Sequence, residues 1–589
     1  MNRRWIFVVF LLALAAPSAQ QRSIDDFFTE LSDGWVRLNP DLAVATRYFN
    51  ATNKDEQDRL EQQLSSYSDK AEQQRLAYVR RGLGELKRFD RSRITQAQRL
   101  SADLLQYQLQ SYLDWAPHDD YVFPLDQFFG ANASLVNALA VQHPMAAARD
   151  ASNYVVRLTQ VAPRMAEMVV ESRQRADKDL IPPRFILVRT IDQMRSFIAE
   201  PPARNPLVTS LIERSANITD LPAVERVALA SKAERIVGDA IYPQWRSTIA
   251  FLESLLPRSA DNAGLWRFEG GAAAYTYFLK NFTTTNMKAD EIHEIGLHQV
   301  ARLEREMDAL FRKLGRTQGT IKERIEQLKK DLSYPLTDEG RTQILADADA
   351  MIREAERRSA LQFDTRPKSR VIVQAYPRFR EASAAATYMS PPVDGSRPAI
   401  FQIPLRPDRM TKFGLRTLVH HETVPGHHFQ IGLMSENASL PRFRQLRLFG
   451  GISAITEGWA LYSERLTAES GWYETDIEGR LGQLDAELFR ARRLVVDTGL
   501  HAKRWTREQA IDYGIPAPEV ERYVVMPGQA TSYMIGQLKI LELRDRTKAR
   551  MGARFSERDF HNVVLGAGAV PLDLLEQEVG RYLEVESKK

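Results

Sequence analysis

Four of the ten histidines in the chain lie within the nine positions 420–428, in the segment HHETVPGHH. Histidine is a common zinc ligand, and in zinc peptidases a glutamate that follows the first ligand histidine is the general base. Here Glu422 directly follows His421. The segment therefore predicts a metal site with a base beside it.

The spacing of these histidines departs from the usual zinc-peptidase helix, in which two ligand histidines four residues apart share one face. The position four after His421 is Pro425, and a regular helix would carry both His427 and His428 out of reach. Proline removes a backbone donor and glycine accepts unusual backbone angles, so Pro425-Gly426 predicts a bulge or widening of the helix. Treated as a two-residue insertion, this pair returns His427, and not His428, to the side of His421.

A third ligand is expected from a second helix, because catalytic zinc usually has three protein ligands and one open position. Thr456 is a candidate cap for such a helix, which would place Glu457 in its first turn. Glu464 lies seven residues further on, about 10 Å along the axis, too far to share the ion. We therefore predict Glu457 as the carboxylate ligand, with zinc as the expected ion and other divalent metals not excluded.

Further candidates lie near the C-terminus. Arg493, Asp497 and His501 are spaced by four on one helical face, as in an exposed ion-pair ladder or an Asp-oriented histidine that faces substrate. Tyr533 lies near the start of a glycine-containing helix, where the glycines indicate a close backbone, a ligand or tight packing. Tyr533 and His501 are the candidate catalytic hydrogen-bond donors to an oxyanion. Other roles stay open, namely those of His420, His428 and Arg397.

The composition limits which partners the protein can have and indicates its cellular location. The 589 residues, 44% of them hydrophobic, can bury a large core, and 80 basic against 76 acidic residues argue against a nucleic-acid partner. Residues 1–19 have the charged, apolar and small-residue regions of a signal peptide, and the apolar run is too short for a stable membrane span. No cysteine is present, which excludes a lipid-anchored cysteine, a disulfide and a thiolate ligand. We expect an exported protein, periplasmic or secreted.

The hydrophobic pattern predicts a mainly α fold. Long helices are expected over residues 57–89, 146–178, 224–256, 288–314, 340–362 and 571–585, with Ser23 capping an earlier one. The glycine-rich break at 264–277 divides the chain into a helical half at 20–260 and a second half at 261–589 that carries the metal site. Short β-favouring runs at 370–376 and 399–403 predict a small sheet beside the metal helix, whose edge could hold an extended peptide.

Several segments together resemble one family. The chain resembles the bacterial DUF885 family, from its N-terminal helices to near its C-terminus, in four motifs: His421-Glu422-x-x-Pro425-Gly426-His427-x-x-Gln430, Glu457-Gly458-Trp459-Ala460-Leu461-Tyr462-x-Glu464, Asp394-Gly395-Ser396-Arg397-Pro398 and Asp497-Thr498-Gly499-Leu500-His501. The resemblance implies a helical, gluzincin-like zinc metallopeptidase fold with a deep cleft between two helical halves. It implies histidine ligands at His421 and His427, a carboxylate ligand at Glu457 and a base at Glu422.

The predicted activity is zinc-dependent hydrolysis of a peptide substrate. Zinc would activate water and polarise the scissile carbonyl, and Glu422 would take the proton and pass it to the leaving amine. Two other functions stay open: a catalytically inactive periplasmic protein that binds peptide or metal, and a metal-dependent amidase or esterase acting on a non-peptide substrate. Neither the side-chain preference, the choice between exo- and endopeptidase action nor the oligomeric state follows from the sequence.

Overall fold

A computed structural model describes residues 22–376, 378–381, 385–391, 397–407 and 410–588. The predicted signal peptide, 1–19, and the first three residues of the Asp394-Gly395-Ser396-Arg397-Pro398 motif lie outside these residues. Helices make up most of the described chain, and the predicted mainly α class is confirmed. None of the helices in the described part combines the length and the apolar character that crossing a membrane requires.

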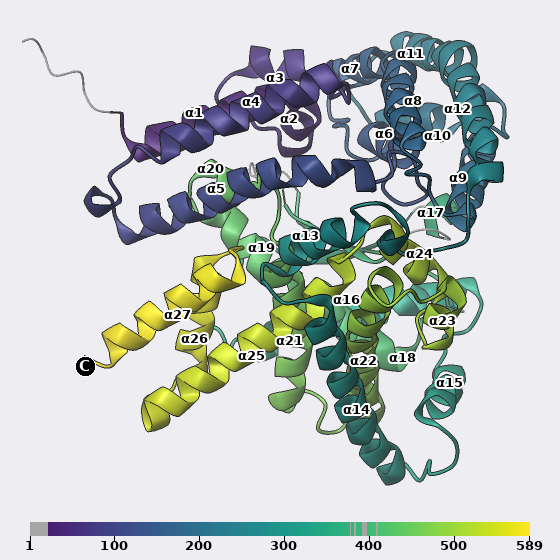
Figure 1. The fold of residues 1–589 in the computed structure, drawn as a ribbon. Helices are drawn as coiled ribbons and strands as arrows, with labels where there is room; N and C mark the ends of the chain where they lie inside the picture. Colours follow the sequence, from purple (N-terminus) through teal and green to yellow (C-terminus); the bar gives the residue numbers. More distant parts are fainter. Residues whose placement is uncertain (1–21, 377, 382–384, 392–396, 408–409, 589) are drawn as a thin grey trace, which may run out of the picture.

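The N-terminal helices lie mostly across the upper part of Figure 1. Ser23 caps the first of them by accepting the backbone N–H of Asp26, as predicted. The helices expected at 57–89 and 146–178 are each two helices; in the first, Ser68 accepts the N–H of Ala71 and starts a new helix. The bounds are α1 Ile24–Arg37, α2 Pro40–Thr46, α3 Lys54–Glu61, α4 Asp69–Leu86, α5 Gln96–Trp115, α6 Ala131–Ala140, α7 Ala148–Leu158, α8 Val161–Asp177, α9 Arg184–Phe197, α10 Pro206–Ser215, α11 Ala223–Ile236 and α12 Tyr242–Leu255.

The remaining helices lie mostly in the lower part of the same view (Figure 1). Those expected at 288–314, 340–362 and 571–585 are present within a few residues of the predicted ends. The bounds are α13 Gly271–Thr283, α14 Ala289–Lys313, α15 Ile321–Asp331, α16 Asp338–Ser359, α17 Arg378–Glu381, α18 Lys412–Glu422, α19 His427–Glu436, α20 Arg442–Gln445, α21 Ser453–Glu469, α22 Ile477–His501, α23 Arg507–Asp512, α24 Ala517–Val525, α25 Ser532–Met551, α26 Glu557–Ala567 and α27 Leu572–Glu586.

A small sheet precedes α18. Strands β1 (Val371–Ala375) and β3 (Ala399–Ile403) pair in parallel, and β2 (Thr387–Met389) pairs antiparallel to β3, in the order β1-β3-β2. The two predicted strands are confirmed, whereas β2, three residues long, is too short for its alternation to stand out. The Tyr388 hydroxyl lies 3.1 Å from Nδ1 of His428, which places the β2 edge beside α19.

Two hydrophobic cores hold the helices together. The larger core joins apolar side chains of residues 24–123 to many from 263–583, and the second is formed mainly by residues 125–255. Contacts across the sequence tie the first helices to the larger core: the Trp35 indole N–H donates to the Leu448 carbonyl at 2.8 Å, and the Phe28 and Phe443 rings lie 5.4 Å apart. The division into halves at residue 260 stays a prediction.

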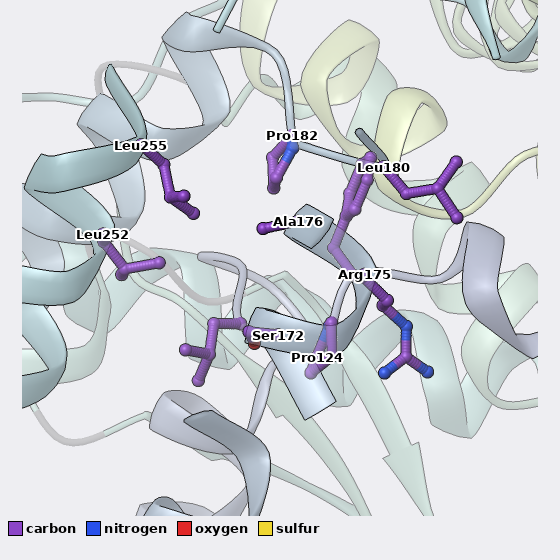
Figure 2. A pocket seen from close by; sticks show the side chains of 10 residues that line it. Pro124, Ser172, Arg175, Ala176, Leu180, Pro182, Leu252 and Leu255 are labelled. Carbon is purple, nitrogen blue, oxygen red and sulfur yellow. The ribbon is translucent and has the colours of Figure 1, made fainter. Parts of the chain in front are cut away.

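A cavity in the second core is shown in Figure 2. Its volume of about 10 Å³ is room for a single water molecule, so it is a packing gap rather than a substrate pocket. The residues that line it all come from the N-terminal helices and their connections: Phe123, Pro124, Leu125, Ser172, Arg175, Ala176, Leu180, Pro182, Leu252 and Leu255.

Candidate metal centre

The HHETVPGHH segment breaks the helix completely. Helix α18 ends at Glu422 and α19 begins at His427, so the predicted bulge within one helix is instead a tight turn between two helices. Gly426 permits this turn, because a Cβ atom there would lie 2.0 Å from the His421 carbonyl oxygen and 2.4 Å from that of His420. The close return of the backbone brings the start of α19 against the last turn of α18.

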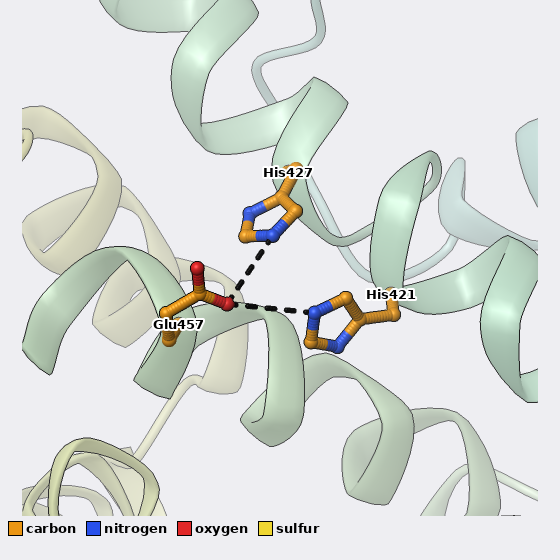
Figure 3. A group of neighbouring side chains, drawn as sticks. All are labelled: His421, His427 and Glu457. Carbon is orange, nitrogen blue, oxygen red and sulfur yellow. Dashed lines mark ion pairs between the residues drawn. The ribbon is translucent and has the colours of Figure 1, made fainter. Parts of the chain in front are cut away.

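His421, His427 and Glu457 form a compact group, shown in Figure 3. Their nearest nitrogen and oxygen atoms lie within 4.8 Å of one another, and within the described residues no other such group of three is found. Oε2 of Glu457 lies 3.6 Å from Nε2 of His421 and 3.5 Å from Nε2 of His427.

These two separations fit a shared ion better than direct contact. Charge-assisted hydrogen bonds measure about 2.7–2.9 Å, which is shorter than either separation. Ligand distances of about 2.0–2.2 Å around a tetrahedral ion give edges of about 3.3–3.6 Å between ligand atoms. The donor set of two imidazoles and one carboxylate is also one that zinc accepts. The residues present therefore fit a divalent ion of this type.

Helix α21 starts earlier than expected. Its first residue is Ser453, with Ile452 as cap, so the expectation of Thr456 as cap is wrong and Glu457 follows the first turn rather than lying within it. Glu457 still faces the two histidines, because the apolar contacts of Trp459 and Leu461, both fully buried, fix the rotation of the helix. The side chain of Glu457 is 21% exposed, so the group opens to solvent on this side.

Glu464 holds the ring of His421 in place by a hydrogen bond on the side away from Glu457, a role that the sequence did not reveal. Nδ1 of His421 donates to Oε1 of the fully buried Glu464 at 2.7 Å, which leaves Nε2 free to face Glu457. Burial alone would lower the pKa of His421, but Glu457 and Glu464 raise it to about 9. The pKa of Glu457 is lowered despite burial, because of His427 and His421. The seven-residue spacing of the two glutamates is the only sequence signal for this arrangement.

Glu464→Gln is expected to weaken zinc binding by about 10–100-fold, because outer carboxylates orient ligand histidines and make them more basic. In the metal-free protein His421 holds a proton up to pH about 9, and zinc has to displace that proton to bind. The zinc affinity should therefore increase about tenfold for each unit by which the pH is raised, up to pH about 9. The neutral amide stabilises the imidazolium less, and the pH dependence should move to lower pH. Chelator-competition titrations from pH 6 to 9 measure both effects, with exposed Glu294→Gln as the control. Equal affinity of variant and wild type at every pH would contradict this role.

Glu422, the predicted base, is the last residue of α18 and is only 8% exposed. Burial raises the pKa of its carboxyl, while the charges of His427 and His421 oppose that rise. The charges of both histidines therefore act on the Glu422 carboxyl. A carboxyl that binds protons more readily than an exposed glutamate is suited to accept and return one.

Tyr533 lies beside the group, at the start of α25. Its ring is nearly parallel to that of His421, with 6.4 Å between the ring centres, and the Arg493 guanidinium lies 4.5 Å from the centre of the same ring. The structure thus brings Tyr533 to the candidate centre. Arg490 and Arg493 of α22 join it there, and the sequence did not indicate this, because their positions depend on how α22 packs against α18 and α21.

Two glycines set the distance between the helices that carry Glu457 and Tyr533. A Cβ atom at Gly458 would lie 2.6 Å from Gly536, and one at Gly536 would lie 1.8 Å from the Ala454 carbonyl oxygen. Helices α21 and α25 therefore cross with their backbones in contact. Among the open explanations for the glycines near Tyr533, the close approach of another backbone is the one observed at Gly536.

His501 is not brought to the group, and its prediction as a catalytic donor is wrong. Its Nδ1 accepts the Leu265 backbone N–H at 3.2 Å, its Nε2 lies 3.0 Å from the Tyr523 carbonyl oxygen, and burial lowers its pKa to about 4. Both ring nitrogens are thus occupied by the backbone. Asp497 does not orient it, because Asp497 accepts from the Tyr275 hydroxyl and the Gly528 N–H. The spacing of four therefore marks neither an exposed ion-pair ladder nor a histidine that Asp497 orients toward substrate.

The other histidines of the segment also face elsewhere. Nδ1 of His420 lies 3.1 Å from the Tyr473 hydroxyl, and burial lowers the pKa of His420 to about 3. His428 contacts Tyr388 of β2, as described above. The half-buried Arg397 donates to the Pro398 carbonyl at 3.1 Å. Of the described histidines, only His421 and His427 belong to the candidate centre.

A family model for a bacterial protein of unknown function, DUF885, matches residues 49–579 of the chain. The chain belongs to the DUF885 family. This confirms the resemblance seen in the sequence motifs. No curated protein matches this DUF885 chain.

Two solved structures share the fold of this DUF885 chain. One is described as "the putative lipoprotein from Colwellia psychrerythraea"; it is 32% identical with a TM-score of 0.88, covering 95% of this chain and 99% of its own. The other is "a putative lipoprotein of unknown function from Shewanella oneidensis", 20% identical with a TM-score of 0.70, covering 94% and 99%. The second likeness concerns the fold alone, and neither description states an activity.

Proposed function

We propose that this DUF885 protein is an exported, zinc-dependent peptidase with a gluzincin-like active site in a cleft between helical halves. The observation that carries the proposal is the spacing of Glu457 Oε2, 3.6 and 3.5 Å from the two histidine nitrogens. In this proposal His421, His427 and Glu457 hold the ion. The predicted signal peptide and the lipoprotein description of the protein from Colwellia psychrerythraea support export.

The residues of the chain divide the chemistry among them. Zinc bound there would lower the pKa of water and polarise a carbonyl group. Glu422 accepts a proton from the attacking water and delivers it to the leaving amine, so that one side chain serves as base and then as acid. Tyr533 donates a hydrogen bond to the oxyanion that develops at the attacked carbonyl. Glu464 keeps His421 in the tautomer whose Nε2 faces the ion.

The buried glutamate beside the ligands favours this function over metal storage. A site that only holds metal gains nothing from a second carboxylate that does not ligate, and burial of Glu422 makes its ionisation costly. A base next to the first ligand is what hydrolysis needs. This holds for peptide, amide and ester substrates alike, so the substrate class is decided by experiment.

Digestion of a peptide library by the metal-free and the zinc-reloaded protein tests the proposal. The expected result is cleavage of peptide bonds that falls by at least about 100-fold on chelation and returns with zinc, read by mass spectrometry. Cobalt and manganese serve as comparison ions. Stoichiometric zinc binding without any product would instead support the inactive binding protein, and turnover confined to other amides or esters would support the amidase or esterase.

A further inference from the structure

A cluster of guanidinium groups lies on the α22 side of Tyr533. Arg493 lies 4.5 Å and Arg490 6.0 Å from the centre of the Tyr533 ring. Since that ring centre is 6.4 Å from that of His421, Arg493 is at most about 11 Å from the histidine, a distance that roughly three residues of extended peptide span. The distance is therefore short enough for a substrate with its scissile bond at the candidate centre to span it.

The guanidinium of Arg493 has unused hydrogen-bonding capacity. Its Nε donates to the Tyr523 hydroxyl at 3.0 Å, and Nη2 donates to Glu519 at 3.0 Å. Nη1 makes no well-formed hydrogen bond within the described residues, the Tyr533 hydroxyl being a polar neighbour of the guanidinium, and the residue as a whole is only 7% exposed. Arginine presents its N–H groups in a planar fork that matches a carboxylate. A buried, charged donor without a well-formed hydrogen bond beside a candidate active site indicates a ligand that supplies the acceptor.

The charges around the cluster leave one positive charge unmatched. Arg490 lies 3.5 Å from Glu464, whereas Arg493 and Arg522 share the single carboxylate of Glu519, each at 3.0 Å. Arg522 turns its Nη1 to the neutral Gln529 at 2.7 Å. Arg493 and Arg522 thus face one carboxylate between them. Buried charges are normally paired, so an incoming anionic group is favoured at this position.

We infer that Arg493 binds a carboxylate of the substrate, so that the candidate peptidase selects peptides that present this group about three residues from the scissile bond. The inference rests on the proposed function for its substrate class. The group that Arg493 binds is a carboxylate in either case, whether it is the C-terminus of the peptide or an acidic side chain. In this arrangement Glu519 and Tyr523 hold the guanidinium in place, and Nη1 makes the bond to substrate.

Binding to the Glu422→Gln protein, loaded with zinc, tests the inference without turnover. Two pairs of fluorescently labelled peptides are compared by anisotropy: free acid against C-terminal amide, and internal glutamate against glutamine. We expect one pair to show at least about tenfold tighter binding of the carboxylate member, and the pair that does so identifies the source of the carboxylate. Arg493→Gln in the same background should abolish the difference in affinity between the two members of that pair. Arg493→Lys, which keeps the charge but loses the fork, should restore part of it.

Two controls keep the outcomes separate. Exposed Arg235→Gln changes the net charge equally and should retain the full preference. Zinc content and melting temperature verify that each variant is folded. Equal binding of both members in both pairs by the folded parent protein would overturn the inference and leave the proposed function standing. A preference that survives Arg493→Gln would overturn it as well. Absence of peptide hydrolysis by the zinc-loaded wild type, by contrast, would overturn the proposed function itself.

Discussion

Glu422→Gln is expected to lower kcat for peptide hydrolysis by about 10²–10⁴-fold while about one zinc ion stays bound per chain. The amide has nearly the size of the carboxyl but cannot accept the proton from water. Because Glu422 is not a member of the group formed by the two histidines and Glu457, the metal site should survive the change. Initial rates on a peptide cleaved by the wild type, together with metal analysis of the same samples, provide the measurement.

The control for this substitution is exposed Glu294→Gln on α14, which should keep wild-type activity. If the Glu422→Gln protein kept its zinc and hydrolysed peptides within tenfold of the wild-type rate, Glu422 would not be the base. If it lost its zinc, the separation between the ligands and the base argued above would be wrong.

Gly426→Ala should have the second-largest effect, a loss of zinc affinity, because it displaces the backbone and changes no ligand or reacting group. The added methyl group would lie 2.0 Å from the His421 carbonyl oxygen and 2.4 Å from that of His420. Both contacts are with backbone, which cannot rotate away as a side chain can. Relief requires α18 and α19 to separate, which moves His427 away from His421. We expect zinc affinity to fall by more than about 100-fold, as measured by chelator competition.

Gly84→Ala is the matched control, because a Cβ atom at this exposed position of α4 would meet no other atom within 4 Å. Alanine is a better helix former than glycine, so this variant should be as stable as the wild type or slightly more stable, by up to about 1 kcal/mol. Unchanged zinc affinity in Gly426→Ala would show that the turn can widen without moving the histidines, contrary to the geometry described here.

Local signals in the sequence predicted those parts of the site that depend on neighbouring residues. Pro425 and Gly426 indicated a bulge in one helix that puts His427 beside His421, and the structure brings these two histidines together by a turn between two helices instead. The two longer strands and several helices followed from periodicity in the same way. His501 was misassigned because a spacing of four residues shows which side chains share a face, but not whether that face meets substrate or the interior of the protein.

The positions of Glu464 and Arg493 could not be predicted for a different reason. Each acquires its partner from another helix: Glu464 of α21 meets His421 of α18, and Arg493 of α22 meets Glu519 of α24. Such contacts depend on crossing angles and on the rotation of each helix about its axis. Those quantities are fixed by packing across the whole core, and no motif in the sequence records them.

The crossing of α21 and α25 at Gly458 and Gly536 constrains how the site can move. Glu457 precedes the first of these glycines directly, and Tyr533 lies one turn before the second. Because backbone touches backbone at the crossing, the helices cannot slide or rotate past one another without a clash. The carboxylate and the phenol therefore belong to one rigid body, and any opening or closing of the candidate site has to occur where other elements meet it.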